Sequence, residues 1–213
     1  MSLSELHPTK IAEICNGYWL NGNIPQFAFH STVIDSRQMA GNTLFIALKG
    51  THNDGHDFLV SLADHPEQGA MVKNANPEIR LPQLVVRDVE VGFQALAKFI
   101  AHNSRARKIA ITGSVGKTGT KDMIADMLAV AGNVHATKGN LNNHLGVPVT
   151  LNSMPEHTEF LVAEMGMNSA CEITLLSEIV RLDLAIITRI SNAHAGFFNN
   201  LSDIAKTKAE IFL

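Results

Sequence analysis

The sequence has 213 residues, of which 46% are hydrophobic and 17% charged, and its formal net charge is -3. This length allows one large domain or two small ones with cores of their own. A slightly acidic chain without a basic stripe gives no support for nucleic-acid binding.

The two cysteines, Cys15 and Cys171, make neither a disulfide framework nor a metal cluster, and they indicate free thiols in a reducing compartment. The segment 1–10 lacks the apolar stretch of a signal peptide, and no apolar run reaches membrane-spanning length. We therefore expect a cytoplasmic protein without a membrane span.

The first hundred residues predict a small α/β domain. A helix is expected over 6–16, because Pro8 suits a first turn and Asn16-Gly17 is a stop signal. Further along, we expect extended segments at 26–29, 32–34, 43–48, 69–72 and 83–86, a short helix at 58–64 and an amphipathic helix over 93–101. The polar, basic segment 102–108 separates two complete α/β patterns, so we place domains at 1–104 and 105–213.

The second half alternates strands with helices. Strands are expected at 108–112, 134–137, 159–164 and 184–188, and helices from Lys117, over 169–180 and from Ser202. The helix from Lys117 carries an apolar stripe of Thr120, Met123, Ile124, Met127, Leu128 and Ala131. Such alternation is typical of βαβ units and a mostly parallel sheet, so the predicted fold class is α/β.

The most informative motif, Thr112-Gly113-Ser114-Val115-Gly116-Lys117-Thr118, lies between an apolar strand and a helix. Its glycines let backbone N–H groups crowd an anion, and the helix N-terminus adds partial positive charge. Lys117 is expected to reach the β/γ-phosphates of a nucleotide, and the Thr118 hydroxyl to face Mg²⁺. Ile111 stands where the usual pattern has another glycine, so a bare glycine turn before a helix is the alternative.

Polar residues follow two other strands of this half. Parallel strands present their carboxyl ends on one edge, where ligands bind. Glu164 ends an apolar run and His194 follows the last strand, so this edge is expected to collect both with Lys117 and Thr118. Thr118 and Glu164 offer the oxygen ligands that Mg²⁺ prefers. His194 is an unusual ligand for that ion, and a hydrogen-bonded loop histidine is the alternative.

Lys208 lies within the apolar stripe of the last predicted helix, whereas Lys206 lies off it. A buried lysine is rare and is usually paired or functional. The alternative is that its stem lies along the stripe and its ammonium reaches water. In the first half, the polar loop 51–57 follows a buried strand, and it is either a ligand-binding loop or a solvated surface loop.

Together these motifs resemble those of the Mur ligases, ATP-dependent enzymes of bacterial peptidoglycan synthesis. The loop 112–118 is similar to the contracted phosphate loop of that family, which accounts for the missing glycine. Segments 35–37, 44–50 and 54–58 are similar to the N-terminal domain of two family members. The one that adds D-alanyl-D-alanine is favoured by Thr120-Lys121-Asp122, by 139–148 and by 164–168 with Glu172-Ile173.

The resemblance implies a small substrate-binding α/β domain followed by a P-loop ATP-binding domain. It assigns the ATP phosphates to Gly113, Ser114, Val115, Gly116, Lys117, Thr118 and Gly119, and magnesium to Thr118, Glu164 and His194. Lys208 matches the lysine that the family carries as a carbamate, and it joins Lys117, Glu164 and His194 in the expected catalytic set. The UDP-sugar end of the substrate is assigned to Asp35, Ser36, Arg37, Lys49, Asn53, Asp54, Gly55 and His56, with Asn142 and Asn143 near its path between the domains.

The implied reaction joins D-alanyl-D-alanine to UDP-N-acetylmuramoyl-tripeptide through an acyl phosphate and releases ADP and phosphate. The alternatives are the ligase for the third stem-peptide residue, a non-catalytic module that binds UDP-sugar and ATP, and a P-loop switch protein or small-molecule kinase. The chain stops inside the expected central domain, so we expect a fragment without ligase activity. We also expect a monomer. Gly119 and Cys171 depart from the family pattern, which commonly has Thr and Gly there.

Overall fold

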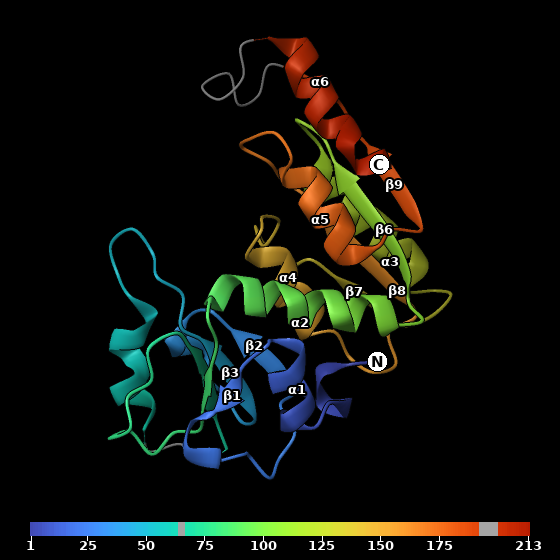
Figure 1. Cartoon of the computed structure of the whole chain (residues 1–213). Coiled ribbons are helices and arrows are strands. Elements are labelled where there is room, and N and C mark those ends of the chain that lie inside the picture. The colour runs from blue at the N-terminus through green and yellow to red at the C-terminus, as the bar shows by residue number, and fades with distance from the viewer. Residues whose placement is uncertain (64–66, 192–199) are drawn as a thin grey trace.

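The computed structural model describes residues 1–63, 67–191 and 200–213, which form two α/β halves with one sheet each (Figure 1). The first sheet has the strand order β1-β5-β4-β3-β2. Its strands are β1 (Tyr18–Trp19), β2 (Ser31–Val33), β3 (Thr43–Ile46), β4 (Gly69–Val72) and β5 (Gln83–Val85). Strands β2 to β5 run parallel, and β1 pairs antiparallel with β5. Their parallel direction brings the segments that follow β2, β3 and β4 to one edge of the sheet.

The helices of this half differ in part from expectation. The α-helices are α1 (Pro8–Ile14) and α2 (Val89–Asn103), and the 3₁₀ segments are η1 (Leu3–Glu5), η2 (Leu20–Gly22), η3 (Ser36–Gln38) and η4 (Gly55–Leu62). The short helix predicted at 58–64 corresponds to the 3₁₀ helix η4, which begins three residues earlier. The predicted extended segment at 26–29 is not a strand. The two-residue strand β1 is too short for a periodic signal.

The second sheet is parallel, with the order β7-β8-β6-β9. Its strands are β6 (Arg107–Thr112), β7 (Val134–Ala136), β8 (Phe160–Glu164) and β9 (Leu184–Ile187). The helices are α3 (Lys117–Leu128), α4 (Gly146–Asn152), α5 (Glu172–Val180) and α6 (Leu201–Ala209), and the 3₁₀ segment η5 (Glu210–Phe212) follows. The predicted α/β class with a parallel second sheet is confirmed.

The buried face of α3 is not the predicted one. Met123 and Met127, both placed on the predicted stripe, are 67% and 72% exposed. The buried residue of α3 is instead Lys121, beside the half-buried Ile124 and Leu128. The predicted stripe is thus right for Ile124 and Leu128 and wrong for Met123 and Met127. Lys121 was missed because a hydrophobicity pattern scores a lysine as a solvent-facing residue even where its ammonium is paired inside the protein.

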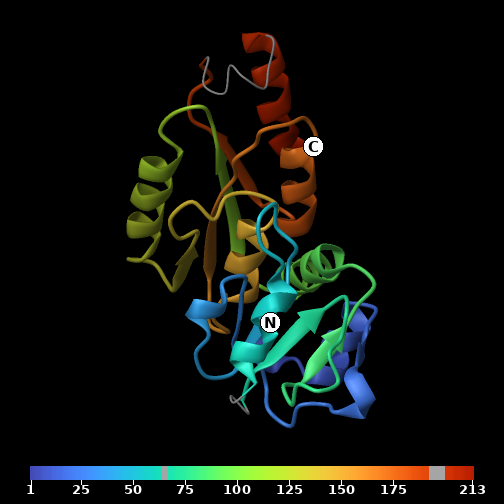
Figure 2. The same ribbon diagram turned by 90° about the vertical axis from the view of Figure 1, so that its left-hand side faces the viewer.

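Helix α2 lies between the two halves and packs on both (Figures 1 and 2). Its Phe93, Leu96 and Ile100 are fully buried, and they belong to one apolar core that runs from Leu3 to Ile211. Helix α4, which the sequence analysis did not anticipate, packs against α2 from the second half. The two halves thus share a core, and the predicted division at 104/105 stays a prediction.

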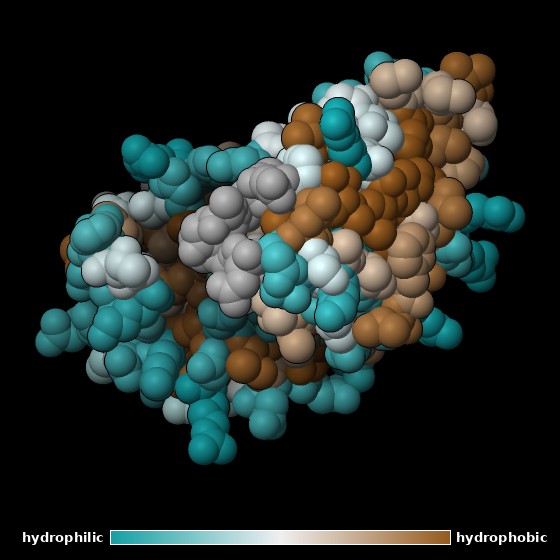
Figure 3. All heavy atoms as spheres, turned by 90° about the horizontal axis from the view of Figure 1, so that it is seen from above, coloured by the Kyte–Doolittle hydropathy of each residue, from teal (hydrophilic) through white to brown (hydrophobic). Residues whose placement is uncertain are grey.

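Apolar side chains also gather at the surface on one side of the second half, as Figure 3 shows from above. In this half, Leu184 of the outer strand β9 is exposed, as are Met123 and Met127 of α3. None of the helices in the described ranges is long and apolar enough to cross a membrane.

Candidate functional site

The phosphate-type loop connects β6 to α3 through two glycines with positive φ. Gly113 has φ 152° and Gly116 has φ 87°, conformations that L-residues rarely adopt. A Cβ at Gly113 would also overlap the Thr188 hydroxyl. The loop therefore needs glycine at both positions, and the chain that leaves β6 turns directly into the N-terminus of α3.

The outer side of this loop is held by the segment that follows β9. Ser114 N–H donates to the Arg189 carbonyl at 2.7 Å, and the Thr188 hydroxyl donates to the Val115 carbonyl at 2.7 Å. The Ser114 hydroxyl donates to the Ser191 carbonyl at 3.0 Å. Because the Ser114 amide is engaged here, an anion would meet the N–H groups that follow it in the loop and at the start of α3.

Lys117 reaches back over the loop, and Thr118 reaches the end of β8. The Lys117 ammonium donates to the Gly113 carbonyl at 2.8 Å. The Thr118 hydroxyl donates to Glu164 Oε2 at 2.8 Å, and Glu164 is buried at the end of β8. The structure thus brings together three of the residues that the sequence analysis grouped, from the ends of β6 and β8 and the start of α3.

Asn142 takes part in the same cluster. Its side-chain amide donates to Glu164 Oε1 at 2.9 Å, and its backbone carbonyl accepts from the Gly166 amide at 2.7 Å. The neighbouring Asn143 accepts from the amides of Leu145 and Gly146 at the start of α4. The structure gives both asparagines partners within the chain, and their contact with a substrate stays a prediction.

Lys208 is 1% exposed, so the buried alternative for this lysine is the correct one. Burial, and after it the charge of Lys117, lowers the pKa of Lys208 from 10.5 to about 8. The positive charge of Lys117 therefore acts on the Lys208 ammonium and disfavours its protonated form. His194, the remaining member of the expected catalytic and metal set, lies outside the described residues.

The two oxygen donors fit a hard divalent cation. Mg²⁺ is held in nucleotide sites by one or two protein oxygens, with phosphates and water completing the shell. The Thr118 hydroxyl and the Glu164 carboxylate supply such a pair, already in contact. Among the described residues there is no group of three His, Cys, Asp or Glu side chains arranged for a metal ion, so a site built only from protein ligands is not found there.

The N-terminal candidates form two separate clusters at the edge of the first sheet. Past β2, Asp35 accepts two hydrogen bonds from the Arg37 guanidinium and one from the Arg37 amide. These bonds lower the pKa of Asp35 to about 2. Ser36 begins the 3₁₀ turn η3 that Asp35 caps. The Arg37 side chain is exposed, and its guanidinium is paired with Asp35.

The second cluster lies past β3 and centres on His56. Its Nε2 accepts from the Lys73 amide at 3.0 Å, so the proton lies on Nδ1, which donates to Asp54 at 2.6 Å. Hydrogen bonds from His56 lower the pKa of Asp54. At Gly55, a Cβ would stand 2.8 Å from the Ala47 backbone, so the loop requires glycine there.

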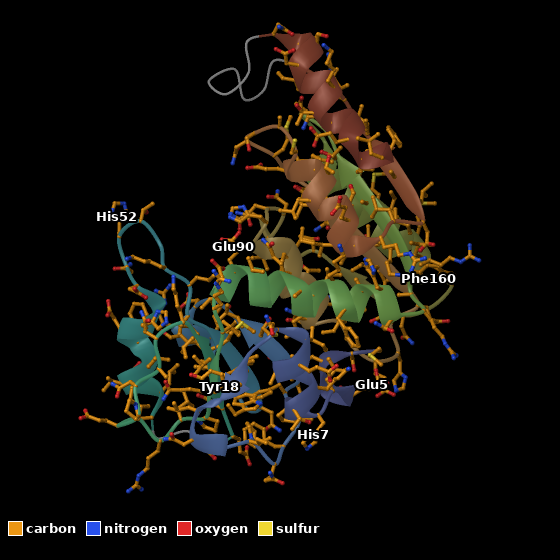
Figure 4. All side chains as sticks on the ribbon, viewed as in Figure 1. Glu5, His7, Tyr18, His52, Glu90 and Phe160 are labelled. Atoms are coloured by element: carbon orange, nitrogen blue, oxygen red, sulfur yellow. The ribbon has the colours of Figure 1, made fainter. Side chains whose placement is uncertain are left out.

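A cavity of about 220 Å³ joins part of this cluster to α2, with Lys49, His56, Lys73 and Glu90 among its lining. Figure 4 marks Glu90 at the start of α2 and His52 at the tip of the loop after β3, on the same side of the molecule. Asn53 lies in that loop, where its carbonyl accepts from the Gly50 amide at 2.9 Å. Asp88 and Glu90 line the cavity as well, so two carboxylates balance its two lysines, and Asp88 already caps the N-terminus of α2. Binding of the UDP-sugar end of the substrate here stays a prediction.

Some residues of the site carried no separate signal in the sequence analysis. Lys73 follows β4 at the same sheet edge, so the strand-end rule that picked Lys49 would have found it too. Gln94 donates to the His144 carbonyl at 3.2 Å and ties α2 to the loop that carries Asn142. That contact joins residues 50 apart in the sequence and has no local pattern.

Comparison with known families decides the classification. Residues 28–104 match the Mur ligase family, catalytic domain, and residues 111–213 match the Mur ligase middle domain. The chain belongs to the Mur ligase family. The phosphate loop, Glu164 and Lys208 lie in the middle-domain match, and the clusters of Asp35 and His56 lie in the other.

Particular Mur ligases match almost the whole chain. The UDP-N-acetylmuramoyl-tripeptide--D-alanyl-D-alanine ligase of Bacillus subtilis (strain 168) is 38% identical over 95% of this chain and 45% of that ligase. The Escherichia coli (strain K12) protein of the same name is 36% identical over 96% of this chain and 44% of its own length. The chain therefore spans less than half the length of these relatives.

Solved Mur ligase structures agree with the fold. Crystal structure I of MurF from Acinetobacter baumannii superposes with a TM-score of 0.89 at 34% identity, over 96% of this chain and 45% of the other. MurF from Thermotoga maritima, solved in complex with ADP, has a TM-score of 0.75 at 28% identity, over 85% of this chain and 42% of that one. The arrangement of the two halves is thus that of the Mur ligases.

Proposed function

We propose that this chain supplies the ATP-phosphate site and the UDP-sugar site of a Mur ligase that joins D-alanyl-D-alanine to UDP-N-acetylmuramoyl-tripeptide. The observation that carries the proposal is the contact of Thr118, one residue past the loop lysine, with the buried Glu164 carboxylate. A bare glycine turn before a helix has no need of a carboxylate there. The names of the most similar relatives support this ligase over the one for the third stem-peptide residue.

In the proposed reaction, the terminal carboxylate of the tripeptide attacks the γ-phosphorus of ATP, and ADP leaves. The amine of D-alanyl-D-alanine then attacks the acyl phosphate, and phosphate leaves. Lys117 would exchange its bond to the Gly113 carbonyl for the β/γ-phosphates, and the first amides of α3 would hold the same groups. Magnesium bound at Thr118 and Glu164 would neutralise phosphate charge, so the protein's contribution is chiefly alignment.

The carbamate on Lys208 belongs to this proposal. A pKa of about 8 leaves roughly one tenth of the Lys208 side chains as neutral amine at pH 7. The neutral nitrogen attacks CO₂, a C–N bond forms, and one proton is released, which leaves a carbamate anion. The change replaces a cation facing Lys117 with an anion. A carbamate carbon signal after addition of ¹³CO₂, absent in Lys208→Met, would support it.

Calorimetric titration of the chain with ADP and Mg²⁺ tests the nucleotide site. We expect Lys117→Met to weaken binding about tenfold or more, since a charge-assisted hydrogen bond is worth about 1.5–3 kcal/mol. The matched control is Lys206→Met, because Lys206 is an exposed lysine away from the loop. Equal binding by Lys117→Met and the control would contradict the proposal.

A second titration tests the substrate assignment. We expect UDP-N-acetylmuramoyl-tripeptide to bind to the chain, and binding to weaken in Lys49→Met, which removes a cation from the cavity lining. A chain that binds ADP but no UDP-sugar would favour the kinase or switch alternative. We expect the 213-residue chain alone to form no product with D-alanyl-D-alanine, and product formation would contradict that expectation.

A further inference from the structure

Lys121 is a buried cation next to the nucleotide site that the proposed reaction does not use. It lies one turn after Thr118 on α3, so both side chains leave the same face of the helix. Its side chain is 7% exposed, and its ammonium lies 2.8 Å from a carboxylate oxygen of the neighbouring Asp122. An ammonium is costly to bury without hydrogen-bond partners, so its contacts on the sheet side of α3 indicate why a lysine stands here.

The partner on the sheet side is Thr137, in the segment that follows β7. The Lys121 ammonium donates to the Thr137 carbonyl at 2.8 Å. Thr137 is itself buried, and its amide donates to the Val162 carbonyl of β8 at 3.1 Å. Its hydroxyl accepts from the Glu164 amide at 3.0 Å. One residue therefore connects the ammonium of α3 to the backbone of the metal-site carboxylate.

These hydrogen bonds link α3, the segment 137–142 and Glu164 to one another. From α3, Thr118 holds one carboxylate oxygen and Lys121 holds Thr137. Thr137 holds the Glu164 amide, and five residues later Asn142 holds the other carboxylate oxygen. Breaking the bond between Lys121 and Thr137 would remove the polar contact between α3 and the end of β7, while their apolar contacts and the phosphate loop stay in place. The orientation of Glu164 toward Thr118 would then depend on fewer contacts.

We infer that Lys121 is a positioning residue, which holds the end of β7 against α3 and so keeps Glu164 directed at Thr118. This inference rests on the proposed function, because it takes Thr118 and Glu164 as the protein ligands of the nucleotide-bound metal. An apolar side chain of similar volume would fill the same space, and replacing a buried charge in this way often leaves stability unchanged or higher. The ammonium is needed for two contacts, with the Thr137 carbonyl and with the exposed Asp122 carboxylate, and only the first leads to Glu164.

The test is Lys121→Met in the 213-residue chain, with ADP affinity measured by calorimetry both in Mg²⁺ and in EDTA. Removal of outer partners of metal ligands typically costs 10–100-fold in metal affinity, so we expect the Mg²⁺-dependent gain in ADP binding to fall by about tenfold or more. Binding in EDTA should stay within about twofold, since Lys117 and the loop amides are unchanged. Lys138→Met is the matched control, because Lys138 is an exposed lysine beside Thr137.

A double substitution tests whether Lys121 acts on Glu164 through Thr137. Thr137→Val removes the hydroxyl that accepts from the Glu164 amide. If Lys121 acts through Thr137, the loss of Mg²⁺-dependent affinity in the double variant is smaller than the sum of the single losses. Additive losses would overturn the inference, as would equal losses in Mg²⁺ and in EDTA, which indicate a general structural defect.

Amide exchange separates this inference from the proposed function. In the nucleotide-free chain, Lys121→Met should speed exchange at the Glu164 amide relative to the rest of β8, and Lys138→Met should not. If the unmodified chain shows no Mg²⁺-dependent ADP binding, the proposed function fails. Unchanged local exchange in Lys121→Met would overturn the positioning role, whatever the nucleotide result.

Discussion

Gly119 lies in the first turn of α3. A Cβ added there would meet no atom within 4 Å. Alanine is more favourable than glycine inside a helix by about 1 kcal/mol. We therefore expect Gly119→Ala to raise the free energy of unfolding by about 0.5–1 kcal/mol, measured by urea titration.

The matched control is Gly113→Ala, on the other side of the loop. This substitution meets both a positive φ and the Thr188 hydroxyl, so we expect it to lower stability. A stabilising effect there, or a destabilising one at Gly119, would mean that the loop and the start of α3 have a different conformation from the one described.

Lys208 predicts a pH dependence. Because burial and the charge of Lys117 lower its pKa from 10.5 to about 8, the unfolded chain binds this proton more tightly than the folded one. The destabilisation by the ammonium is therefore complete below pH 8, and it fades as the pH rises toward 10.5. In CO₂-free buffer, Lys208→Met should raise the free energy of unfolding at pH 7 by roughly 1–3 kcal/mol.

This gain should shrink in urea titrations between pH 8 and pH 10.5. Lys206→Met is the control, since that side chain is exposed. A gain from Lys208→Met that is the same at pH 7 and at pH 10.5 would show that packing of the methionine, and not the buried charge, stabilises the variant.

At this scale, the sequence located residues whose position follows from a local rule. Lys117 and Thr118 follow a glycine turn, Glu164 ends an apolar strand, and Lys208 interrupts an apolar stripe. The contact of Asn142 with Glu164 and that of Lys121 with Thr137 join residues that no local pattern relates. These contacts follow from the tertiary arrangement of α3, β7 and β8, which the sequence pattern does not give.

Helix α5 has an unusual start, since its N-cap residue Cys171 has φ 68° and makes no side-chain cap. Glu210, in the segment after α6, replaces that cap. Its carboxylate accepts from the amides of Cys171 at 2.9 Å and Thr174 at 3.1 Å. A negative group is favourable at a helix N-terminus, so Glu210→Ala is expected to lower the free energy of unfolding by about 1–2 kcal/mol.

Thermal or urea unfolding measures this loss. Glu178→Ala serves as the control, because Glu178 is an exposed residue late in α5 and far from its N-terminus. A loss as small as that of the control would show that α5 does not depend on α6 for its cap. The contact matters for the site because it ties the helix that carries Lys208 to α5.

Predictability of whole elements depended on the strength of their periodicity. The strands around β3 and β8 were located because their apolar runs are buried on both faces. Helix α4 was missed because it is short, follows a polar loop and contains Pro148. The prediction of the buried face of α3 was wrong at three positions, because the apolar Met123 and Met127 face solvent while Lys121 does not.

The two halves share one apolar core. Phe93, Leu96 and Ile100 of α2 belong to a core that also contains Val147 of α4 and Ile173 of α5. We therefore expect a single unfolding transition for the chain in calorimetry, with equal calorimetric and van't Hoff enthalpies. Residues 1–104 alone would expose one face of α2, so we expect that piece to be markedly less stable or to aggregate. Two separate transitions would contradict this expectation.

The alternation of strands and helices was enough to predict the α/β class and the parallel second sheet. It could not predict that α2 belongs to both halves, because an amphipathic stripe says how much of a helix is buried but not against what. The polar segment after α2 suggested a linker, although the packing continues across it.

Because α2 packs on both halves, the cavity of Lys49 and His56 and the loop of Lys117 are held at a set separation by side-chain packing. A ligand anchored at the cavity therefore presents its other end at a fixed reach from the loop. On the proposed function, this fixed separation would select substrates by their length. A nucleotide-linked peptide one residue too short would fill the cavity as well as the correct one, yet its carboxylate would stop short of the phosphates.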